Sequence, residues 1–420
     1  MNLFILGNGF DLMCGASTKI DDYLRYKDQQ IKGLGINLYS LITNLPIITK
    51  SKSKYKVNYY FTPDERLNDE TTLDFWTVLF LKNYYEIRDT NNEKQNNKLT
   101  KWVDIESLIF EVASGIHNMF NIPPSERMLT TSDVEFIKTL LLKNGYPTYP
   151  NSNGILPELE ETMEFLFKEL IQFDLNFANY LSYLETNKSA DFSIQKEVYA
   201  KKKAFWEVNK KNKLLKLYQS DIILNFNYTD SQRPITFTSD GMLANPVNEI
   251  NIHGRYPDAK DSINNFNGNA VPLIFGFDQS LLDSFDSYQL NRFTKTNQLL
   301  ELNRRYPAAS RTGLFNPNIQ DIYFMGHSLS KADWSYFYSI FDFLKVYENE
   351  NLKLHFLYSI EYATDPNNSS FLGQYQSSVF SLINNYGAKL NNINNGDYLL
   401  TKLTLENRID FIPVAFTINN

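Results

Sequence analysis

The chain has 420 residues, of which 43% are hydrophobic and 21% charged, a composition typical of a globular protein with a sizeable core. Its net charge of -7 argues against a nucleic-acid partner, because phosphate contacts need clustered Lys and Arg. Its single cysteine, Cys14, excludes an internal disulfide and a Cys-based metal site.

The chain shows no membrane signal. Its first residues lack the basic start of a secretion signal, and no apolar stretch approaches the roughly eighteen residues of a spanning helix. We therefore expect a cytoplasmic protein with no membrane partner. A basic run at Lys201–Lys203 is followed by Lys210, Lys211, Lys213 and Lys216, and its helix-forming neighbours favour a solvated helix face.

The chain begins with a short apolar run at residues 2–6, which ends in Gly7-Asn8-Gly9 before Asp11 begins a helical pattern. This order predicts a buried strand, a tight turn and a helix. Apolar residues that recur every three or four positions predict helices over 72–90, 102–120, 132–143 and 157–186. Strand patterns follow at 221–226, 235–238, 249–252, 271–275, 320–325 and 352–358, with helical patterns at 288–304, 331–346 and 370–386. Asn-rich residues 388–398 are expected to be a loop.

Strands that alternate with helices indicate βα units in a parallel sheet. We predict an α/β fold of the Rossmann-like type, with a mostly parallel sheet and a large helical insertion. Residues 1–30 and 218–420 would form a discontinuous nucleotide-binding domain, and residues 31–217 the mainly helical insertion.

The first candidate motif is Gly7-Asn8-Gly9-Phe10-Asp11. Glycines between a strand and a helix let the backbone approach a ligand closely. Leu12 stands where the full dinucleotide fingerprint would have a third glycine. Asp11 either caps its own helix or reaches a ribose hydroxyl, so a plain turn and a ligand loop are equally good interpretations.

The second motif is Leu224-Asn225-Phe226-Asn227-Tyr228-Thr229-Asp230. It follows an apolar strand, at the end where open α/β sheets bind their ligands. Asn225 and Asn227 point the same way if the strand continues, and two such amides are costly unless hydrogen-bonded. A structural Asn-rich turn is the alternative.

The third motif is His253-Gly254 at the end of a predicted strand. A histidine there can present its ring to a ligand, and its ordinary pKa suits proton transfer near neutrality. A lone histidine is more often satisfied by a hydrogen bond in the core, and that alternative stays open here.

The fourth motif is Gly326-His327-Ser328, a strand-then-glycine turn that enters a helix with Asp333 just beyond it. Ser328 or Ser330 would cap that helix. The same order, an apolar strand followed by a turn of glycine, asparagine and polar side chains, thus occurs four times. One shared crevice at the carboxyl ends of the strands explains the recurrence most simply. His117 and His355 lie within helical and strand patterns and are expected to be structural.

These motifs, in this order, resemble the bacteriophage abortive-infection AbiH family, whose signatures are similar to GNGFDL, NFNYT, IHG and GHSL followed by Asp. The layout is more distantly similar to sirtuin-like NAD-cleaving domains. By that resemblance Asn227 and His253 take catalytic positions, and Gly326 with Ser328 forms the late turn that contacts the nucleotide. No zinc ribbon exists here, so the resemblance does not extend to protein deacetylation.

The resemblance implies an antiphage enzyme of the NAD glycohydrolase type that cleaves the nicotinamide–ribose bond of NAD or a related nucleotide, with no metal. Asn227 would orient ribose or water, His253 would accept a proton, and Asp11 would hold ribose hydroxyls or stabilise positive charge. The remaining residues of the four motifs would bind the nucleotide: Gly7, Asn8, Gly9, Phe10, Asn225, Gly254, Gly326, His327 and Ser328.

A nucleotide-binding sensor without turnover is the alternative function. A nuclease would need an acidic cluster with metal-ligand spacing, and the sequence shows no convincing cluster of that kind. The sequence leaves open two further partners, a phage-derived trigger protein and a second copy of the chain.

Overall fold

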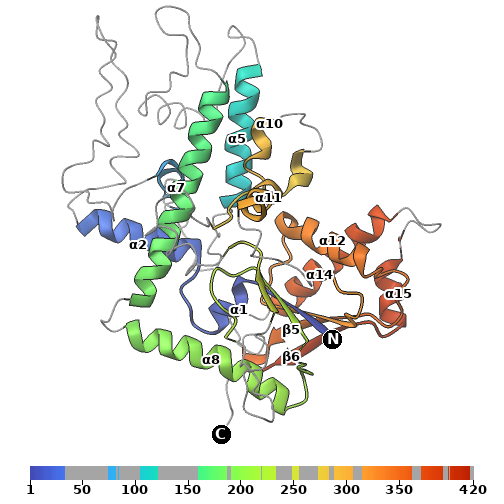
Figure 1. Cartoon of the computed structure of the whole chain (residues 1–420). Helices are drawn as coiled ribbons and strands as arrows, with labels where there is room; N and C mark the ends of the chain where they lie inside the picture. Colours follow the sequence, from blue (N-terminus) through green and yellow to red (C-terminus); the bar gives the residue numbers. More distant parts are fainter. Residues whose placement is uncertain are drawn as a thin grey trace, which may run out of the picture. The chain divides into compact units, whose positions relative to one another are not determined.

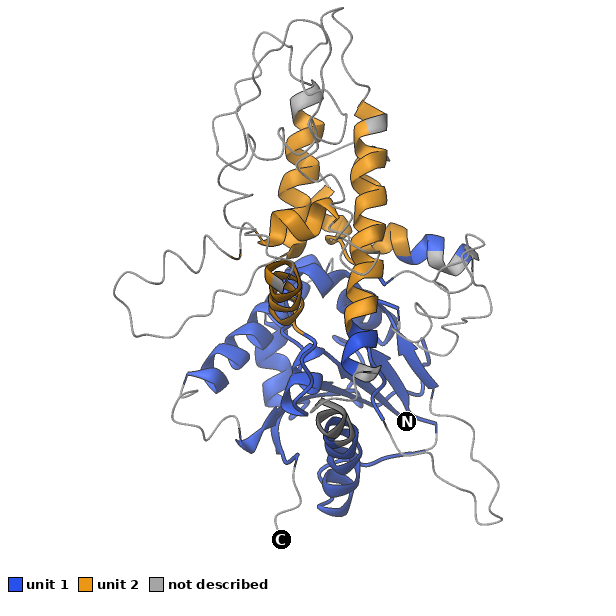
Figure 2. Ribbon diagram, turned by 90° about the vertical axis from the view of Figure 1, so that its left-hand side faces the viewer, with its two compact units in different colours: residues 1–18, 181–273, 299–420 blue, residues 19–180, 274–298 orange. Residues whose placement is uncertain are grey.

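The computed structural model describes residues 1–33, 74–81, 84, 105–121, 159–186, 191–218, 220–232, 248–254, 273–282, 288–305, 315–361, 370–390, 396 and 398–416. The chain divides into two compact units, which Figure 2 colours separately. Unit 1 comprises Met1–Thr18, Leu181–Leu273 and Leu299–Asn420, and unit 2 comprises Lys19–Tyr180 and Ile274–Gln298. These units do not coincide with the predicted domains, since residues 181–217 lie in unit 1 and residues 274–298 in unit 2.

Unit 1 is built on a six-stranded sheet in the order β3-β2-β1-β4-β5-β6, and every neighbouring pair is parallel. The prediction of a Rossmann-like α/β fold with a parallel sheet is confirmed. This strand order is that of doubly wound dinucleotide-binding folds, and it reverses direction between β1 and β4. The strands are β1 (Asn2–Leu6), β2 (Ile222–Asn225), β3 (Asn248–Asn251), β4 (Asp321–Met325), β5 (Lys353–Ser359) and β6 (Ile409–Val414).

Each face of the sheet carries its own core, because successive strand residues point to opposite faces. Leu3 and Ile5 of β1 pack on one face with α12 (Trp334–Phe343), α14 (Phe371–Lys389) and α15 (Leu399–Leu405). Phe4 and Leu6 pack on the other face with residues of α8 (Asp191–Lys211). Figure 1 shows α8 on the opposite side of the sheet from α12 and α14. Both faces of the parallel sheet are therefore covered, which explains the uninterrupted apolar run of β1.

Unit 2 is mainly helical in its described residues, as the apolar spacing predicts. Its elements are α2 (Ile20–Gly33), residues 75–81, α5 (Ile105–Asn121), most of α7 (Leu159–Thr186), η3 (Gln279–Leu282), α10 (Tyr288–Asn291) and the start of α11 (Lys295–Arg305). Aromatic rings dominate its core, where Tyr23 meets Phe173 and Phe177 edge-on at 5.7 and 5.5 Å. None of the helices described in either unit is long and apolar enough to cross a bilayer.

Several predicted elements differ from the structure. The described part of the predicted strand at 271–275 is buried but not a strand, and the Gln298 side chain donates to the Phe275 carbonyl at 2.6 Å. The predicted helix at 288–304 is broken, because the Thr294 hydroxyl accepts from the Asn297 amide and begins α11. Neither β6 nor α15 was predicted. The patterns at 132–143 and 235–238 lie outside the described residues.

His355 joins the three strands at the β6 edge. Its Nδ1 lies 2.7 Å from Asp410 of β6, and its Nε2 lies 2.8 Å from Asp321 of β4. Burial alone would lower the pKa of His355, but the hydrogen bonds to these two carboxylates raise the pKa above its ordinary value. Their contacts tie β4, β5 and β6 together near the amino ends of the strands.

We predict that this network makes unit 1 less stable as the pH rises. Because the folded-state pKa is raised, the contribution of His355 is complete below the unfolded pKa of about 6.5 and is lost as the pH rises through the folded pKa. Urea unfolding of wild type and His355→Gln at several pH values should therefore show a stability difference that shrinks above about pH 6.5. A difference that grows with pH would contradict this assignment.

Candidate functional site

The turns after β1 and β4 pack directly against each other at the point where the strand order reverses. The Gly7 amide donates to the Met325 carbonyl at 2.9 Å, and the Gly9 amide donates to the Gly326 carbonyl at 2.7 Å. A Cβ atom on Gly9 would lie 2.6 Å from the Gly326 oxygen, and one on Gly326 would lie 2.1 Å from the Phe10 nitrogen. Gly326 also has a φ of +66°, which favours glycine. The glycines therefore allow backbone-to-backbone contact, and the Gly9 amide has a protein acceptor.

Asp11 lies inside a helix and forms a buried ion pair. Helix α1 (Asn8–Met13) begins at Asn8, so Asp11 does not begin the helix as the sequence predicted. Its carboxylate lies 2.7 Å from Lys202 Nζ of α8, and both side chains are only 1% exposed. The Thr229 hydroxyl donates to the same carboxylate and accepts from Lys202 at 2.9 Å. The negative charge of Asp11 is thus neutralised by a positive charge of the chain itself.

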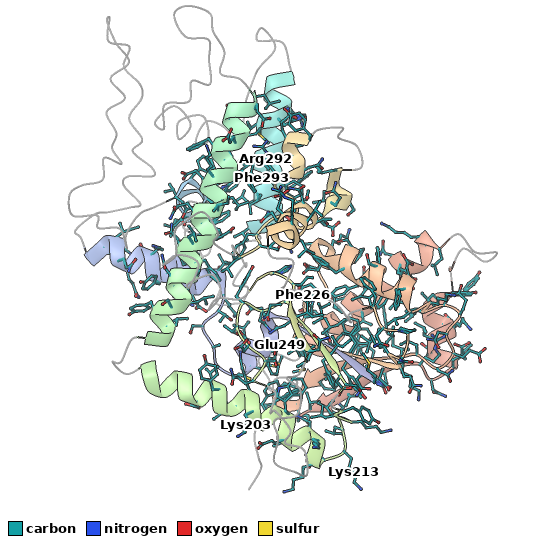
Figure 3. The ribbon with its side chains drawn as sticks, in the orientation of Figure 1. Lys203, Lys213, Phe226, Glu249, Arg292 and Phe293 are labelled. Carbon is teal, nitrogen blue, oxygen red and sulfur yellow. The ribbon has the colours of Figure 1, made fainter. Side chains whose placement is uncertain are left out.

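Lys202 corrects the prediction that Lys201–Lys203 form a solvated face. Lys201 and Lys203 do lie outward, with side chains 35% and 62% exposed, and Figure 3 shows Lys203 on the outer side of α8. Lys202 instead lies on the apolar side of α8, three and four residues before the buried Phe205 and Trp206. That spacing is the signal in the sequence that could have identified it.

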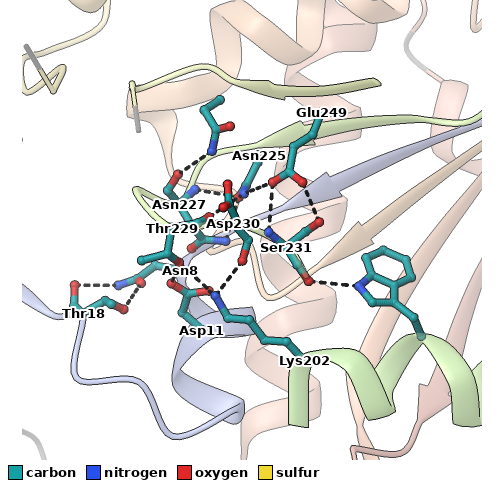
Figure 4. A network of polar contacts seen from close by, with 12 residues as sticks. Asn8, Asp11, Thr18, Lys202, Asn225, Asn227, Thr229, Asp230, Ser231 and Glu249 are labelled. Atoms are coloured by element: carbon teal, nitrogen blue, oxygen red, sulfur yellow. Dashed lines mark hydrogen bonds and ion pairs between the residues drawn. The ribbon is translucent and has the colours of Figure 1, made fainter. Parts of the chain in front are cut away.

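The loop after β2 is held by a chain of amide hydrogen bonds (Figure 4). Asn225 donates to the Thr229 carbonyl at 2.8 Å and to Glu249 of β3 at 2.7 Å, which fixes the direction of its amide. Its Oδ1 then accepts from the backbone and the side-chain amide of Asn227, at 3.0 and 2.9 Å. Glu249 also accepts from both the backbone and the hydroxyl of Ser231, at 3.0 and 2.7 Å. The two asparagines therefore point the same way, and the amide of Asn225 is fully used by the protein.

Asn227 presents a hydrogen-bond acceptor at this edge. Its Nδ2 donates to the Asn225 oxygen, so the other polar atom of the Asn227 amide, Oδ1, points away from Asn225. The residue is 2% exposed, and no hydrogen-bond donor among the described residues reaches that oxygen. A buried amide oxygen without a donor is costly, so this oxygen is a candidate acceptor for a ligand or a water molecule.

A second cluster contains His253, His327 and Asp333, each less than 8% exposed. Asp333 Oδ1 lies 3.6 Å from His253 Nε2, and its Oδ2 lies 3.5 Å from His327 Nε2. The ring of Phe226 meets both imidazoles edge-on, at 5.2 and 4.6 Å. Since Phe226 lies between Asn225 and Asn227 in the chain, the two clusters adjoin at the carboxyl edge of the sheet.

Other predicted site residues have different surroundings. The ring of Phe10 is fully buried against Phe205 at 5.1 Å, and the amide of Asn8 bonds to Thr18. Gly254 has a φ of +82°, and Ser328 is exposed. Ser330 precedes η4 (Lys331–Asp333) but makes no side-chain cap bond.

Cys14 has a structural role. It is fully buried in the core that faces α8. Burial raises its pKa to about 12, although the Lys202 charge acts to lower it. The thiol therefore stays protonated near neutral pH and is a poor nucleophile.

The structure thus brings Asp11, Asn225, Asn227, His253 and His327 to one edge, and the shared crevice there stays a prediction. Sequence analysis missed Lys202, Glu249 and Ser231 as partners of these residues. Within the described ranges, no group of three or more His, Cys, Asp or Glu side chains could hold a metal ion.

This fold and edge define a doubly wound α/β protein with a polar, largely buried carboxyl edge. A family model described as bacteriophage abortive infection AbiH matches residues 3–356. Because the match spans most of the chain, the protein belongs to the AbiH family, and this membership indicates a role in abortive infection, a defence against phage. Searches of curated proteins and of solved structures found no match. The sirtuin-like part of the resemblance has no support in these comparisons.

We predict that Gly326→Ala destabilises unit 1 by about 2–5 kcal/mol. The left-handed backbone costs an alanine roughly 1–2 kcal/mol, and forcing the two turns apart costs about 1–3 more. Gly373 of α14 is the matched control, because nothing lies within 4 Å of its added Cβ. Urea unfolding should show no loss of stability for Gly373→Ala, and an equally harmless Gly326→Ala would refute the close contact.

We also predict that Lys202→Met costs about 3–5 kcal/mol, because it leaves the Asp11 charge buried and unpaired. The double variant Asp11→Asn/Lys202→Met should recover much of that loss, since it removes both charges. Lys203→Met, on the exposed side of α8, should change stability by less than about 0.5 kcal/mol. Equal effects at positions 202 and 203 in thermal or urea unfolding would exclude a buried ion pair.

Proposed function

We propose that the protein acts in phage defence by binding a nucleotide at the carboxyl edge of the sheet and cleaving its base–ribose bond, with NAD or a related nucleotide as substrate. The observation that carries this proposal is the buried Oδ1 of Asn227. This oxygen has no donor among the described residues, and its orientation is fixed by Asn225. A ribose hydroxyl or a carboxamide N–H is a donor that would satisfy it.

The strand order supports a nucleotide as the class of ligand. Doubly wound sheets bind their ligands outside the carboxyl ends of the strands, where the order reverses. The Asp11–Lys202 pair supports the same class, because the pair carries no net charge to repel phosphates. That pairing also changes the role of Asp11. We assign Asp11 to holding Lys202 and Thr229 in place, and no longer to holding ribose or stabilising positive charge.

The chemistry assigned to the edge needs one base and one orienting amide. In NAD hydrolysis the bond between the ribose and the nicotinamide nitrogen breaks and a bond from ribose to water oxygen forms. Nicotinamide leaves as a neutral molecule, so no strong general acid is required, and the transition state resembles an oxocarbenium ion. His253 would accept the proton of the attacking water, and Asn227 would orient the ribose or that water.

A sensor that binds a nucleotide without turnover is the second candidate. The observation that favours it is a backbone hydrogen bond, in which the Gly9 amide donates to the Gly326 carbonyl. That amide therefore has no spare donor capacity for a phosphate, as a nucleotide loop would need. In this version a phage-derived protein or a second copy of the chain would read out the bound state.

We predict that His253→Ala and Asn227→Ala each reduce nicotinamide release by roughly 10²–10⁴-fold and abolish phage protection, because each removes a group positioned for the reaction. The assay incubates the purified chain with NAD, with and without infected-cell extract, and identifies the products by mass. His117→Ala, in α5 of unit 2, is the histidine control and should behave as wild type.

Wild-type activity in both folded variants would contradict the site. Saturable binding of NAD by calorimetry, with no nicotinamide released under any condition, would favour the sensor over the enzyme. Circular dichroism should show that all three variants are folded.

A further inference from the structure

The protonation state of His327 is fixed by the backbone. Its Nδ1 accepts the Leu329 amide at 2.9 Å, so that nitrogen carries no proton and the ring is neutral, with its proton on Nε2. Leu329 has a φ of +56°, a backbone conformation rare for leucine. The indole of Trp334 donates to the Leu329 carbonyl at 2.9 Å and helps to hold that turn. His327 is therefore a rigid donor through Nε2.

Asp333 lies between this donor and His253. Its Oδ2 lies 3.5 Å from His327 Nε2, and its Oδ1 lies 3.6 Å from His253 Nε2. Both distances are slightly longer than a hydrogen bond, and such contacts commonly shorten when a catalytic site binds its ligand. Asp333 precedes α12 directly, so its backbone is anchored by a helix.

The Asp333 carboxylate lies in surroundings where its charge acts strongly on neighbouring groups. Asp333 is 7% exposed, and the two imidazoles pack against Phe226, which is 6% exposed. The rings of Tyr336 and Tyr228 also lie near the His253 ring, with centroid distances of 6.0 and 6.3 Å. A charge acts strongly in such apolar surroundings, where little water screens it.

We propose that Asp333 is a positioning residue that holds the proton of neutral His253 on Nε2. The carboxylate can only accept, so each of its oxygens favours a ring nitrogen that carries a proton. His253 Nδ1 is then the nitrogen with the basic lone pair, and it is the atom that takes a proton during the reaction. This last consequence rests on the proposed function, whereas the position of the proton does not.

The substitution Asp333→Asn tests the proposal, because an amide has one acceptor and one donor side. The locked His327 Nε2–H requires the acceptor, so the amide turns its N–H toward His253 Nε2. His253 must then move its own proton to Nδ1. Asp333→Glu keeps two acceptors and should retain the Nε2 proton. Asp342→Asn, on an exposed position of α12, is the matched control.

The measurement is a long-range ¹H–¹⁵N spectrum of protein labelled in its four histidines, recorded where the rings are neutral. Single substitutions assign each ring. We expect the Nε2–H form of His253 in wild type, Asp333→Glu and Asp342→Asn, and the Nδ1–H form in Asp333→Asn, with His327 unchanged throughout. If Asp333→Asn fails to fold, the wild-type and Asp333→Glu spectra still decide the position of the proton.

An Nδ1–H form of His253 in wild type, or the same form in wild type and folded Asp333→Asn, overturns the proposal. The enzymatic function is judged separately. If the protein releases no nicotinamide but the proton moves as expected, the positioning role stands and the enzymatic function fails. If turnover is present, Asp333→Asn should lower it on the order of 10²–10⁴-fold, because the base would present the wrong nitrogen.

Discussion

The contact between the turns after β1 and β4 is the constraint on which the arrangement of this edge depends. Two amides of the first turn donate to carbonyls at and beyond the end of β4, and side chains on the glycines would prevent this approach. The contact aligns the carboxyl ends of the two central strands. It also joins α1, which carries Asp11, to the turn that carries His327.

Burial then determines how the charges at the edge are arranged. Asp11 is only 1% exposed and is matched by Lys202 from the helix that covers the sheet, while Thr229 bonds to both. Asn225 has a partner for each of its amide atoms, and Glu249 accepts from the loop that it supports. The Oδ1 of Asn227, in contrast, is buried and accepts no hydrogen bond from the described residues.

Much of the fold follows from local patterns in the sequence. Apolar runs predicted five of the six strands, and the polar residues that follow the first four of them, β1 to β4, do lie at one edge. The predicted strand at 271–275 is wrong, because a short apolar sequence has the same pattern in a strand and in a buried irregular segment. The last strand was missed because Pro413 argues against a central strand, and β6 tolerates it as an edge strand.

The candidate site was less predictable, because it depends on partners distant in the sequence. Lys202 is buried although the lysines on either side of it are solvated. Only its helical spacing, which places it on the same side of α8 as the buried Phe205 and Trp206, indicates that burial. The pairing of Gly9 with Gly326 is invisible to sequence patterns, since both a ligand loop and a backbone contact require glycine. The position of Asp333 between His253 and His327 likewise depends on the path of the chain after β4. Local sequence patterns do not predict that path.

Every proposed role of these residues requires that a nucleotide binds at the carboxyl edge of the sheet. The most direct test of that binding is to titrate NAD into the histidine-labelled protein and to follow the four rings, which lie in different parts of the chain. His253 and His327 report on the edge, His355 on the amino ends of the strands and His117 on unit 2. If NAD binds at this edge, the signals of His253 and His327 shift saturably and those of His355 and His117 do not change. No shift at His253 up to millimolar NAD, or shifts only at His355 or His117, would contradict binding at this edge.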